Sequence, residues 1–393
     1  MLNVTLYFQV HQPFRLKRSF GFGEKNGIID IHKNREIFDR VKNKCYLPTT
    51  KLLIELVKKH PELKLSFSFT GTFVEQAKMF DEDALNVFKE LFDTGNIDIL
   101  EETYYHSLAY LIDKEEFTEQ IKMHRDMIKK EFNFVPKIFR NTEAMYSNDI
   151  ANVVSKLGYK GIIAEGWDRI LDWRSPNYVY SPPSGGINVL LRNYRLSDDI
   201  SFRFSSREWK EFPLTADKYS DWISRSDGET VNLFMDYETF GEHQWRETGI
   251  LEFLKHLPSE LIKRGVGFNK ISETASLKSV GIVDVPYLLS WADVDRDVSA
   301  WLGNKMQDAA FEKIKKMRND VLSSNNEELI RDWRILQTSD NFYYMCTKWF
   351  ADGDIHKYFN AYDSPYTAYV NYMNIVSGLE DRIKLFRAQS HKL

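Results

Sequence analysis

The chain has 393 residues, of which 43% are hydrophobic and 28% are charged, and its formal net charge is −4. This length exceeds what one small hydrophobic core needs and predicts two or three domains. A charge so close to neutral excludes a broad basic surface for nucleic acid, and no apolar stretch approaches the roughly 20 residues of a membrane span. We therefore expect a neutral or small substrate rather than a polyanion or a lipid.

The sequence contains two cysteines, Cys45 and Cys346. Their wide separation, in aromatic-rich surroundings, predicts buried thiols rather than a disulfide framework. The N-terminus leads directly into an alternating pattern and lacks the basic start, long apolar run and small-residue cleavage site of a signal peptide. These features predict a soluble, cytoplasmic protein.

The first predicted element is a strand over residues 3–11, whose side chains alternate with a period of two. Val4, Leu6, Phe8 and Val10 share its apolar face, and the other face carries polar side chains that end at His11. In a barrel covered by helices, the apolar face meets the helices and the polar face points inward. His11 would then lie at the carboxyl end of the strand.

Strand-like runs recur along the chain, and helix-like stretches separate most of them. The further predicted strands are 63–70, 97–104, 137–143, 161–165, 189–194 and 231–237. The predicted helices between them are 49–59, 73–92, 115–132 and 147–157. Alternation of this kind predicts an α/β fold with a parallel sheet or barrel of about seven strands.

From about residue 305 the pattern becomes helical throughout, with predicted helices at 305–323, 326–336, 341–350 and 368–386 and turns near Gly353 and Pro365. We expect a catalytic barrel over residues 1–300 and a C-terminal helical bundle over residues 301–393. The stretch 181–186, rich in proline, glycine and serine, is expected to form an exposed loop or hairpin.

Polar clusters follow four of the predicted strands, at the end of the strand where an α/β barrel assembles its site. The first is His11-Gln12-Pro13, in which proline stops the strand. The second runs from residue 95 to His106 and includes Asp98 and further acids. Because unpaired buried charge is costly, a strand so acidic indicates either a site or a salt-bridged strand end.

The third cluster contains Glu143, between an apolar strand and a helix that Ser147 could cap. A structural alternative is a glutamate tied to Arg140 or to the helix N-terminus. The fourth ends a hydrophobic strand at Asp236 and continues through a glycine turn to His243. A barrel can bring these two strand ends face to face.

Glu143 and Asp236 form a pair suited to glycoside chemistry. One carboxylate can attack the anomeric carbon while the other protonates the leaving oxygen, and a retaining enzyme needs the two about 5–5.5 Å apart. The acid must stay protonated near neutral pH, which apolar neighbours such as Phe234 and the charge of the other carboxylate favour.

In this order, the four clusters resemble the motifs of glycoside hydrolase family 57. His11 to Pro13 resembles the first motif, residues 95–99 the second, with Asp98 where Glu is usual, and Asn141 to Ala144 the third. Residues 236–243 are similar to the fourth motif. Residues 290–293 and 300–304 resemble a fifth region, and residues 339–344 are similar to the helical domain of the family.

The resemblance implies a (β/α)7 barrel followed by a helical bundle, and retaining cleavage or transfer of α-glucosidic bonds without an obligatory metal or other cofactor. It implies Glu143 as nucleophile and Asp236 as general acid/base. The substrate-binding residues are then expected to be His11, Asp98, His106, His243, Trp291 and Trp301. The chain departs from many members in having Gln9 where they carry histidine, and in the neighbours of Glu143.

The resemblance favours an α-amylase-type hydrolase of α-1,4-glucans or maltooligosaccharides, while a 4-α-glucanotransferase or branching-type transglycosylase would use the same residues. A non-catalytic glucan-binding protein is an alternative from another class. A zinc enzyme on a related barrel, with ligands among His11, His106, His243 and Asp236, is a further one, but the closely paired histidines typical of such sites are missing.

Tryptophans are candidates for stacking against sugar rings, and their positions separate into three groups. Trp291 and Trp301 are expected to line the cleft, whereas Trp209 and Trp222 are expected to pack in the interior. The sequence does not place Trp167, Trp173 and Trp245. It also leaves open the bond preference, the chain length of the glucan and the oligomeric state.

Overall fold

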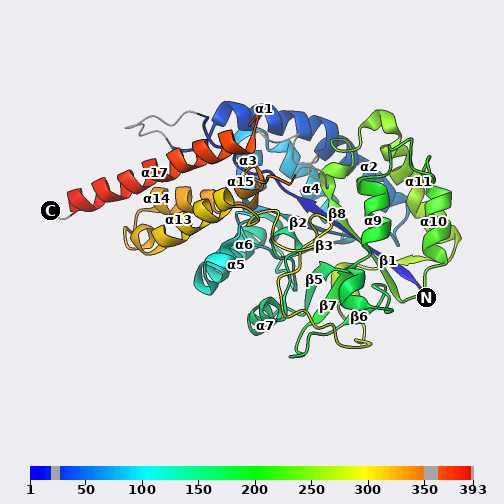
Figure 1. The fold of residues 1–393 in the computed structure, drawn as a ribbon. Helices are drawn as coiled ribbons and strands as arrows, with labels where there is room; N and C mark the ends of the chain where they lie inside the picture. The colour runs from blue at the N-terminus through cyan, green and yellow to red at the C-terminus, as the bar shows by residue number, and fades with distance from the viewer. Residues whose placement is uncertain (19–26, 349–361, 391–393) are drawn as a thin grey trace.

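The computed structural model describes residues 1–18, 27–348 and 362–390. Figure 1 shows the strands surrounded by helices, with the last helices of the chain gathered on one side of the molecule. The strands are β1 (Asn3–Val10), β2 (Leu65–Phe69), β3 (Ile97–Ile99), β4 (Ile138–Phe139), β5 (Gly161–Glu165), β6 (Val179–Tyr180), β7 (Asn188–Arg192), β8 (Thr230–Asp236) and β9 (Gly267–Phe268).

The helices follow the strands as the alternating pattern predicts. Those before residue 300 are α1 (Ile31–Val41), α2 (Leu47–Lys59), α3 (Gly71–Phe80), α4 (Asp83–Phe92), α5 (Ala109–Ile112), α6 (Lys114–Phe132), α7 (Asn148–Lys156), α8 (Asp168–Leu171), α9 (Tyr194–Ser201), α10 (Ala216–Ser224), α11 (Ile250–Lys263) and α12 (Ile271–Thr274). Those after it are α13 (Lys305–Leu322), α14 (Glu327–Leu336), α15 (Ser339–Tyr343) and α17 (Pro365–Ser390). Short 3-10 or π turns are η1 (Lys42–Tyr46), η2 (Thr142–Ala144), η3 (Tyr237–Thr239) and η4 (Arg246–Thr248).

The strands form two sheets, which are parallel except for one strand. One has the order β3-β2-β1-β8, with β9 also pairing with β1, and the other has the order β4-β5-β7-β6. Only β6 runs antiparallel, against β7. The loop that joins these two strands is thus a hairpin, as the sequence predicted for residues 181–186. The expected α/β fold with a parallel sheet is confirmed.

Backbone hydrogen bonds connect the two sheets at both of their edges. Between β3 and β4, the Glu101 amide donates to the Ile138 carbonyl at 2.9 Å and the Arg140 amide donates to the Glu101 carbonyl at 2.8 Å. Beyond β7, the Asn193 amide donates to the carbonyl of Asn232 in β8 at 2.9 Å. The carboxyl ends of the parallel strands therefore surround a common space.

β1 divides its side chains between two environments, as its period of two predicts. The apolar side chains at positions 4, 6, 8 and 10 pack in one hydrophobic core with residues of the covering helices, such as Phe38 and Phe73. Tyr7 belongs to a separate interior cluster with Ile163 and Phe234 from other strands. The predicted assignment of the two faces is confirmed.

Two predicted strands are much shorter than their apolar runs suggested. β3 ends at Ile99 and β4 at Phe139, although the patterns extended to residues 104 and 143. The backbone of His106 has φ 50° and that of Glu143 has φ 55°, a left-handed conformation that a strand cannot contain. The chain therefore leaves the strand conformation before it presents these side chains.

Local hydrogen bonds set the ends of other elements, in one case differently from the prediction. The predicted helix over 73–92 is two helices, α3 and α4, because Asp81 is extended and its carboxylate accepts a hydrogen bond from the Asp83 amide. Ser147 caps α7, as predicted, by accepting from the Ile150 amide at 3.3 Å. Trp209 and Trp222 are half-buried and pack against the main core, which agrees with the packing role expected for them.

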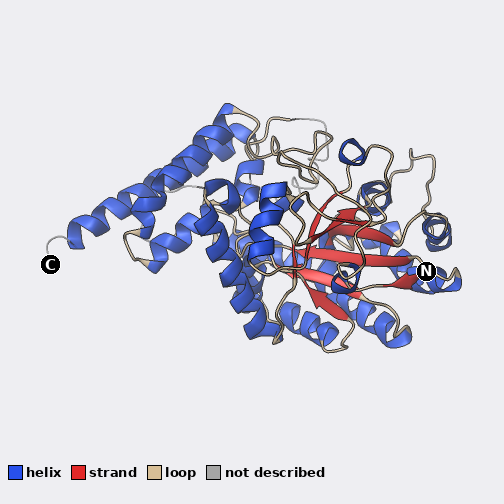
Figure 2. Ribbon diagram, turned by 90° about the horizontal axis from the view of Figure 1, so that it is seen from below, coloured by secondary structure: helices blue, strands red, loops and turns tan. Residues whose placement is uncertain are grey.

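The last helices share a hydrophobic core with loops at the strand ends. Trp333 and Phe342 pack in one cluster with Phe14, Tyr105 and Leu108. Figure 2 shows these helices at one end of the molecule, beside the strands. The predicted helix over 341–350 is the shorter α15; residue 350 and the predicted turn near residue 353 lie outside the described residues. The division into two domains at residue 300 stays a prediction.

In the described part of the chain, no helix combines the length and apolar character that a membrane span requires. Cys45 is buried and Cys346 is half-buried, and both are free thiols.

Candidate active site

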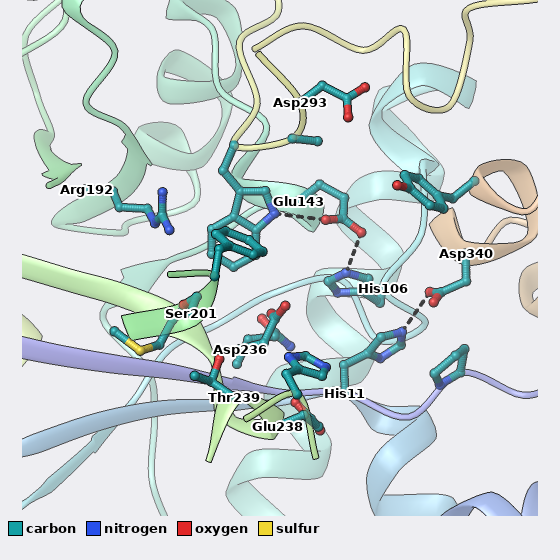
Figure 3. A pocket seen from close by; sticks show the side chains of 18 of the residues that line it. His11, His106, Glu143, Arg192, Ser201, Asp236, Glu238, Thr239, Asp293 and Asp340 are labelled. Carbon is teal, nitrogen blue, oxygen red and sulfur yellow. Dashed lines mark hydrogen bonds and ion pairs between the residues drawn. The ribbon is translucent and has the colours of Figure 1, made fainter. Parts of the chain in front are cut away.

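A pocket opens where the carboxyl ends of the strands converge, and Figure 3 shows its side chains at close range. Six of the eight predicted site residues line it: His11, His106, Glu143, Asp236, His243 and Trp291. They come from segments spread over 280 positions of the chain (291 minus 11). The expectation that strand ends assemble one site is therefore met for these six.

Both carboxylate oxygens of Glu143 are hydrogen-bonded within the pocket. Glu143 lies in η2 with φ 55° and ψ 30°, and its side chain is buried. One carboxylate oxygen, Oε1, accepts a hydrogen bond from Ser339 Oγ at 3.0 Å and lies 3.2 Å from His106 Nε2. The other, Oε2, accepts from the indole Nε1 of Trp291 at 2.9 Å. Donors on both oxygens stabilise the ionised carboxylate and fix its orientation.

Two cationic side chains lie close to the Trp291 ring. The guanidinium of Arg140 lies 4.9 Å from the centre of the indole ring and that of Arg192 lies 5.7 Å from it, both within cation–π distance. The Trp291 amide also donates to the Glu143 carbonyl at 3.2 Å. Trp291 therefore contacts the backbone and the side chain of Glu143, and its ring is positioned by charges rather than by apolar packing alone.

Arg192 is in turn fixed by a buried set of charges. Its guanidinium donates to Glu165 Oε2 at 3.1 Å and to Asp198 Oδ1 at 2.5 Å. A second arginine, Arg296, contacts the same two acids at 3.1 and 3.6 Å. Because two cations meet two anions, the cluster is close to neutral and can be buried at lower cost than isolated charges.

His106 joins Glu143 to a second buried acid. Its Nδ1 lies 3.1 Å from Glu102 Oε2 and its Nε2 faces Glu143. Burial and the Arg140 guanidinium disfavour a charge on the imidazole, but the hydrogen bonds to Glu102 and Glu143 prevail and raise the pKa of His106 to about 9. Burial opposes ionisation of Glu102 as well, but its contacts with His106 and Arg140 lower its pKa to about 2.

His11 stacks on His106 with ring centres 4.1 Å apart. Its Nδ1 lies 3.0 Å from Thr70 Oγ1, and its Nε2 lies 3.0 Å from Asp340 Oδ2. Burial and the neighbouring His106 lower the pKa of His11 to about 4, although Asp340 acts in the opposite direction. His11 is therefore neutral near pH 7 and donates Nε2–H to Asp340.

Asp236 is the last residue of β8, directly opposite Gln9 of β1 in the strand pairing. It lines the same pocket as Glu143 and approaches it from a different strand (Figure 3). Glu238, two residues further on, also lines the pocket and is buried. Burial and the charge of Asp236 raise the pKa of Glu238 to about 8, although Tyr46 donates a 2.5 Å hydrogen bond to Oε1.

Asp98 and Trp301 do not belong to the pocket, contrary to the prediction. Asp98 is buried within β3, where Oδ2 accepts from the Ser272 amide at 3.1 Å, on the side where α12 packs. Trp301 is only 1% exposed and packs in the core of the last helices. Asp98 lies in the middle of β3 rather than at its end, and Trp301 lies in an apolar stretch that packs in the core. Neither side chain therefore reaches a pocket built at the strand ends.

The pocket also contains residues that were not singled out. Arg192, Asp293 and Asp340 line it, and Ser339 contacts Glu143. Arg192 is the last residue of β7 and lies near the end of the predicted strand over 189–194, so the strand-end rule that identified Asp236 could have found it. Asp293, Ser339 and Asp340 lie in stretches that resemble the family, 290–293 and 339–344, but no strand-end pattern pointed to a site role for them.

The described residues offer no cluster of metal ligands. Among them, no group of three or more His, Cys, Asp or Glu is arranged to hold a metal ion. Both ring nitrogens of His11, one of the ligands of the zinc alternative, face protein oxygens.

The pocket brings the carboxyl side chains of Glu143 and Asp236 together at or after the ends of two parallel strands, and a pair of carboxyl groups is what glycoside hydrolysis uses. Residues 5–288 match the family model of glycosyl hydrolase family 57, and the chain belongs to this family. It is 46% identical, over 98% of its own length and 86% of the relative's, to a protein of Methanocaldococcus jannaschii named "Putative alpha-amylase".

More distant relatives extend the comparison. A 4-alpha-glucanotransferase of Thermococcus litoralis is 23% identical to this chain in a match that covers 56% of this chain and 35% of that protein. Among solved structures, the GH57-type branching enzyme of Pyrococcus horikoshii superposes with a TM-score of 0.69 at 15% identity, covering 98% of this chain and 95% of that one. The structural likeness shows a common fold.

Proposed function

We propose that the chain is a retaining enzyme that cleaves α-1,4-glucosidic bonds of α-glucans, of the α-amylase type, with Glu143 as nucleophile and Asp236 as general acid/base. The carrying observation is the pocket itself: an acid whose two oxygens are both hydrogen-bonded shares it with a second acid from another strand. The matched family and the name of the 46% identical relative support the substrate class.

The reaction has two steps. In the first, Glu143 attacks the anomeric carbon while Asp236 donates its proton to the glycosidic oxygen, so that the leaving sugar departs neutral and an ester forms on Glu143. In the second, Asp236 removes a proton from water, whose oxygen attacks the anomeric carbon and releases Glu143 as a carboxylate. Two inversions give net retention.

Three neighbours suit Glu143 to both steps. His106, Ser339 and Trp291 offer hydrogen bonds to its oxygens, and these stabilise the negative charge that returns when the ester breaks. We assign His11 and His243 to the hydroxyls of the sugar at the cleavage point, since both line the pocket. We also propose that β1, β2, β3, β4, β5, β7 and β8 close into a seven-stranded barrel.

Transfer to a sugar acceptor is the second candidate function. It differs only in the second step, in which a sugar hydroxyl replaces water. The comparisons support transfer as a candidate, because the relatives include a 4-alpha-glucanotransferase and the fold matches that of a branching enzyme. A non-catalytic glucan-binding protein is disfavoured by the presence of both carboxyls in one pocket.

Product analysis with maltoheptaose separates these functions. The wild-type protein should yield shorter sugars if it hydrolyses, and a ladder above seven units if it transfers. Glu143→Gln and Asp236→Asn should each lower kcat by about 10³-fold or more, because each removes one reacting group. Near-normal turnover in either variant would refute its assigned role.

Two controls complete this test. Azide should restore turnover to a Glu143→Gly variant by attacking from the vacated side and forming a glycosyl azide of inverted configuration. Dialysis against a chelator should leave wild-type activity intact; lasting loss that zinc reverses would favour the zinc enzyme. Binding of maltooligosaccharide without any turnover would favour the glucan-binding alternative.

A further inference from the structure

The stretch from residue 337 to 340 runs from the end of α14 into the first turn of α15. It reaches the site from outside the matched family region. The family model ends at residue 288, yet Ser339 Oγ donates to Glu143 Oε1 at 3.0 Å and Asp340 Oδ2 lies 3.0 Å from His11 Nε2. The Ser339 amide also donates to the His106 carbonyl at 3.0 Å. One short segment thus touches Glu143, His11 and His106.

This segment is rigidly attached to the wall of the pocket. The Leu108 amide donates to the Gln337 carbonyl at 2.9 Å, and Thr338 Oγ1 donates to the Tyr105 carbonyl at 3.1 Å. Residues 337, 338 and 339 are all buried. A hydroxyl held in this way can fix the position of the carboxylate that it contacts, because neither partner is free to move away.

We propose that Ser339 is a positioning residue for Glu143, so that the C-terminal helices supply part of the active site. Its hydroxyl orients Oε1 together with His106 and favours the ionised form of the nucleophile. The proposal rests on the proposed function for the role of Glu143. It assigns to the C-terminal region a contribution to the reaction itself rather than to stability alone.

The charges around Glu143 come from every neighbouring element. His106 lies beside the Glu143 carboxylate, and Arg140 lies beside the indole of Trp291. Asp236 of β8 and Arg192 of β7 line the same pocket. Asp293, from the loop after residue 291, and Asp340, from α15, line it as well. All of these remain when Ser339 is changed. If Glu143 ionises at a different pH in a Ser339 variant, the difference is therefore due to the Ser339 hydroxyl.

The test compares the pH profile of kcat/KM in wild type, Ser339→Ala and Ser339→Thr. Loss of a hydrogen bond to a charged group should move the acid limb of Ser339→Ala upward by about one pH unit and lower kcat about 10- to 100-fold. Ser339→Thr keeps the hydroxyl and should retain the wild-type limb. Ser339→Cys, a weaker donor of similar size, should shift the limb by less.

Ser324→Ala is the matched control, because Ser324 is also a buried serine of the C-terminal region, between α13 and α14. Its hydroxyl donates to the Val321 carbonyl at 2.6 Å and accepts from the Asn326 amide at 3.2 Å, and neither partner belongs to the pocket. The acid limb of Ser324→Ala should stay at the wild-type position. An unshifted limb in Ser339→Ala, or an equal shift in Ser324→Ala, would overturn the proposal.

A second measurement requires no substrate. The ¹³C carboxyl signal of Glu143, assigned through its loss in Glu143→Gln, should titrate at higher pH in Ser339→Ala than in wild type. If maltoheptaose is not turned over, the proposed function fails while this titration still decides the role of Ser339. An unchanged titration in an active enzyme would refute the positioning role alone.

Discussion

Trp291 donates its indole N–H to Glu143 Oε2, and the guanidinium groups of Arg140 and Arg192 lie within cation–π distance of its ring. Trp291→Phe would keep the ring in place and remove only the hydrogen bond. We expect kcat on maltoheptaose to fall about 10- to 100-fold, with a smaller effect on KM, because the lost donor acts on the nucleophile. Steady-state kinetics measure both.

Trp301→Phe is the matched control for this change. Trp301 is fully buried among the last helices and does not line the pocket. The variant should have a lower Tm, through lost packing, and a kcat within about twofold of wild type. A large fall in kcat at unchanged stability would restore Trp301 to the site, and an unaffected Trp291→Phe would refute the donor role.

The raised pKa of His106 makes stability depend on pH in a predictable direction. Because this pKa is about 9, compared with 6.5 for a free histidine, the contribution is fully present below pH 6.5 and is lost as the pH rises through 9. The difference in unfolding free energy between wild type and His106→Gln should be larger at pH 6 than at pH 10, by roughly 1–3 kcal/mol.

Urea titrations at the two pH values measure this difference. Thr118→Ala serves as a control, since Thr118 is partly exposed on α6 and donates to the Lys114 carbonyl of its own helix. Its difference from wild type should be the same at both pH values. A His106→Gln difference that does not change with pH would show that the imidazole is neutral in the folded protein.

At the scale of the elements, the loop after β8 depends on close approach of two backbones. Gly241 has φ +121°, and a Cβ atom there would lie 2.0 Å from the Lys44 carbonyl oxygen of η1. Gly241→Ala should therefore lower the unfolding free energy by about 2 kcal/mol or more and displace His243 from the pocket.

Gly249→Ala separates the two causes. Gly249 also has a positive φ, of +86°, but a Cβ atom there has nothing within 4 Å. Its cost should be about 1 kcal/mol, from the backbone conformation alone. Equal destabilisation of the two variants in urea would show that the contact between Gly241 and η1 is unimportant.

At the scale of the whole molecule, the loops at the strand ends and the last helices share a hydrophobic core, and both contribute residues to the pocket. Tyr105 and Leu108 of the strand-end loops pack with Trp333 and Phe342, and Ser339 contacts Glu143. A fragment of residues 1–300 should thus be less soluble than the full chain and lack a cooperative thermal transition. A folded, stable fragment would instead confirm two independent domains.

The sequence by itself determined the order of the elements and the strand ends at which the two carboxyl groups of the proposed mechanism lie. The alternation in β1 separated an inner from an outer face, and proline and glycine marked the strand ends at which His11 and Asp236 lie. These features are local, since side-chain periodicity and turn residues act within a few positions. Short-range patterns therefore sufficed for the fold class and for the strand-end positions of His11 and Asp236.

Only the tertiary structure decided which distant side chains surround Glu143. Ser339 and Trp291 lie 196 and 148 positions beyond it, and Trp301, ten residues after Trp291, turns into the core instead. Which of two neighbouring tryptophans meets a carboxylate depends on packing between segments far apart in the chain. No local pattern encodes that, because the partners are specified by the fold and not by their own neighbours.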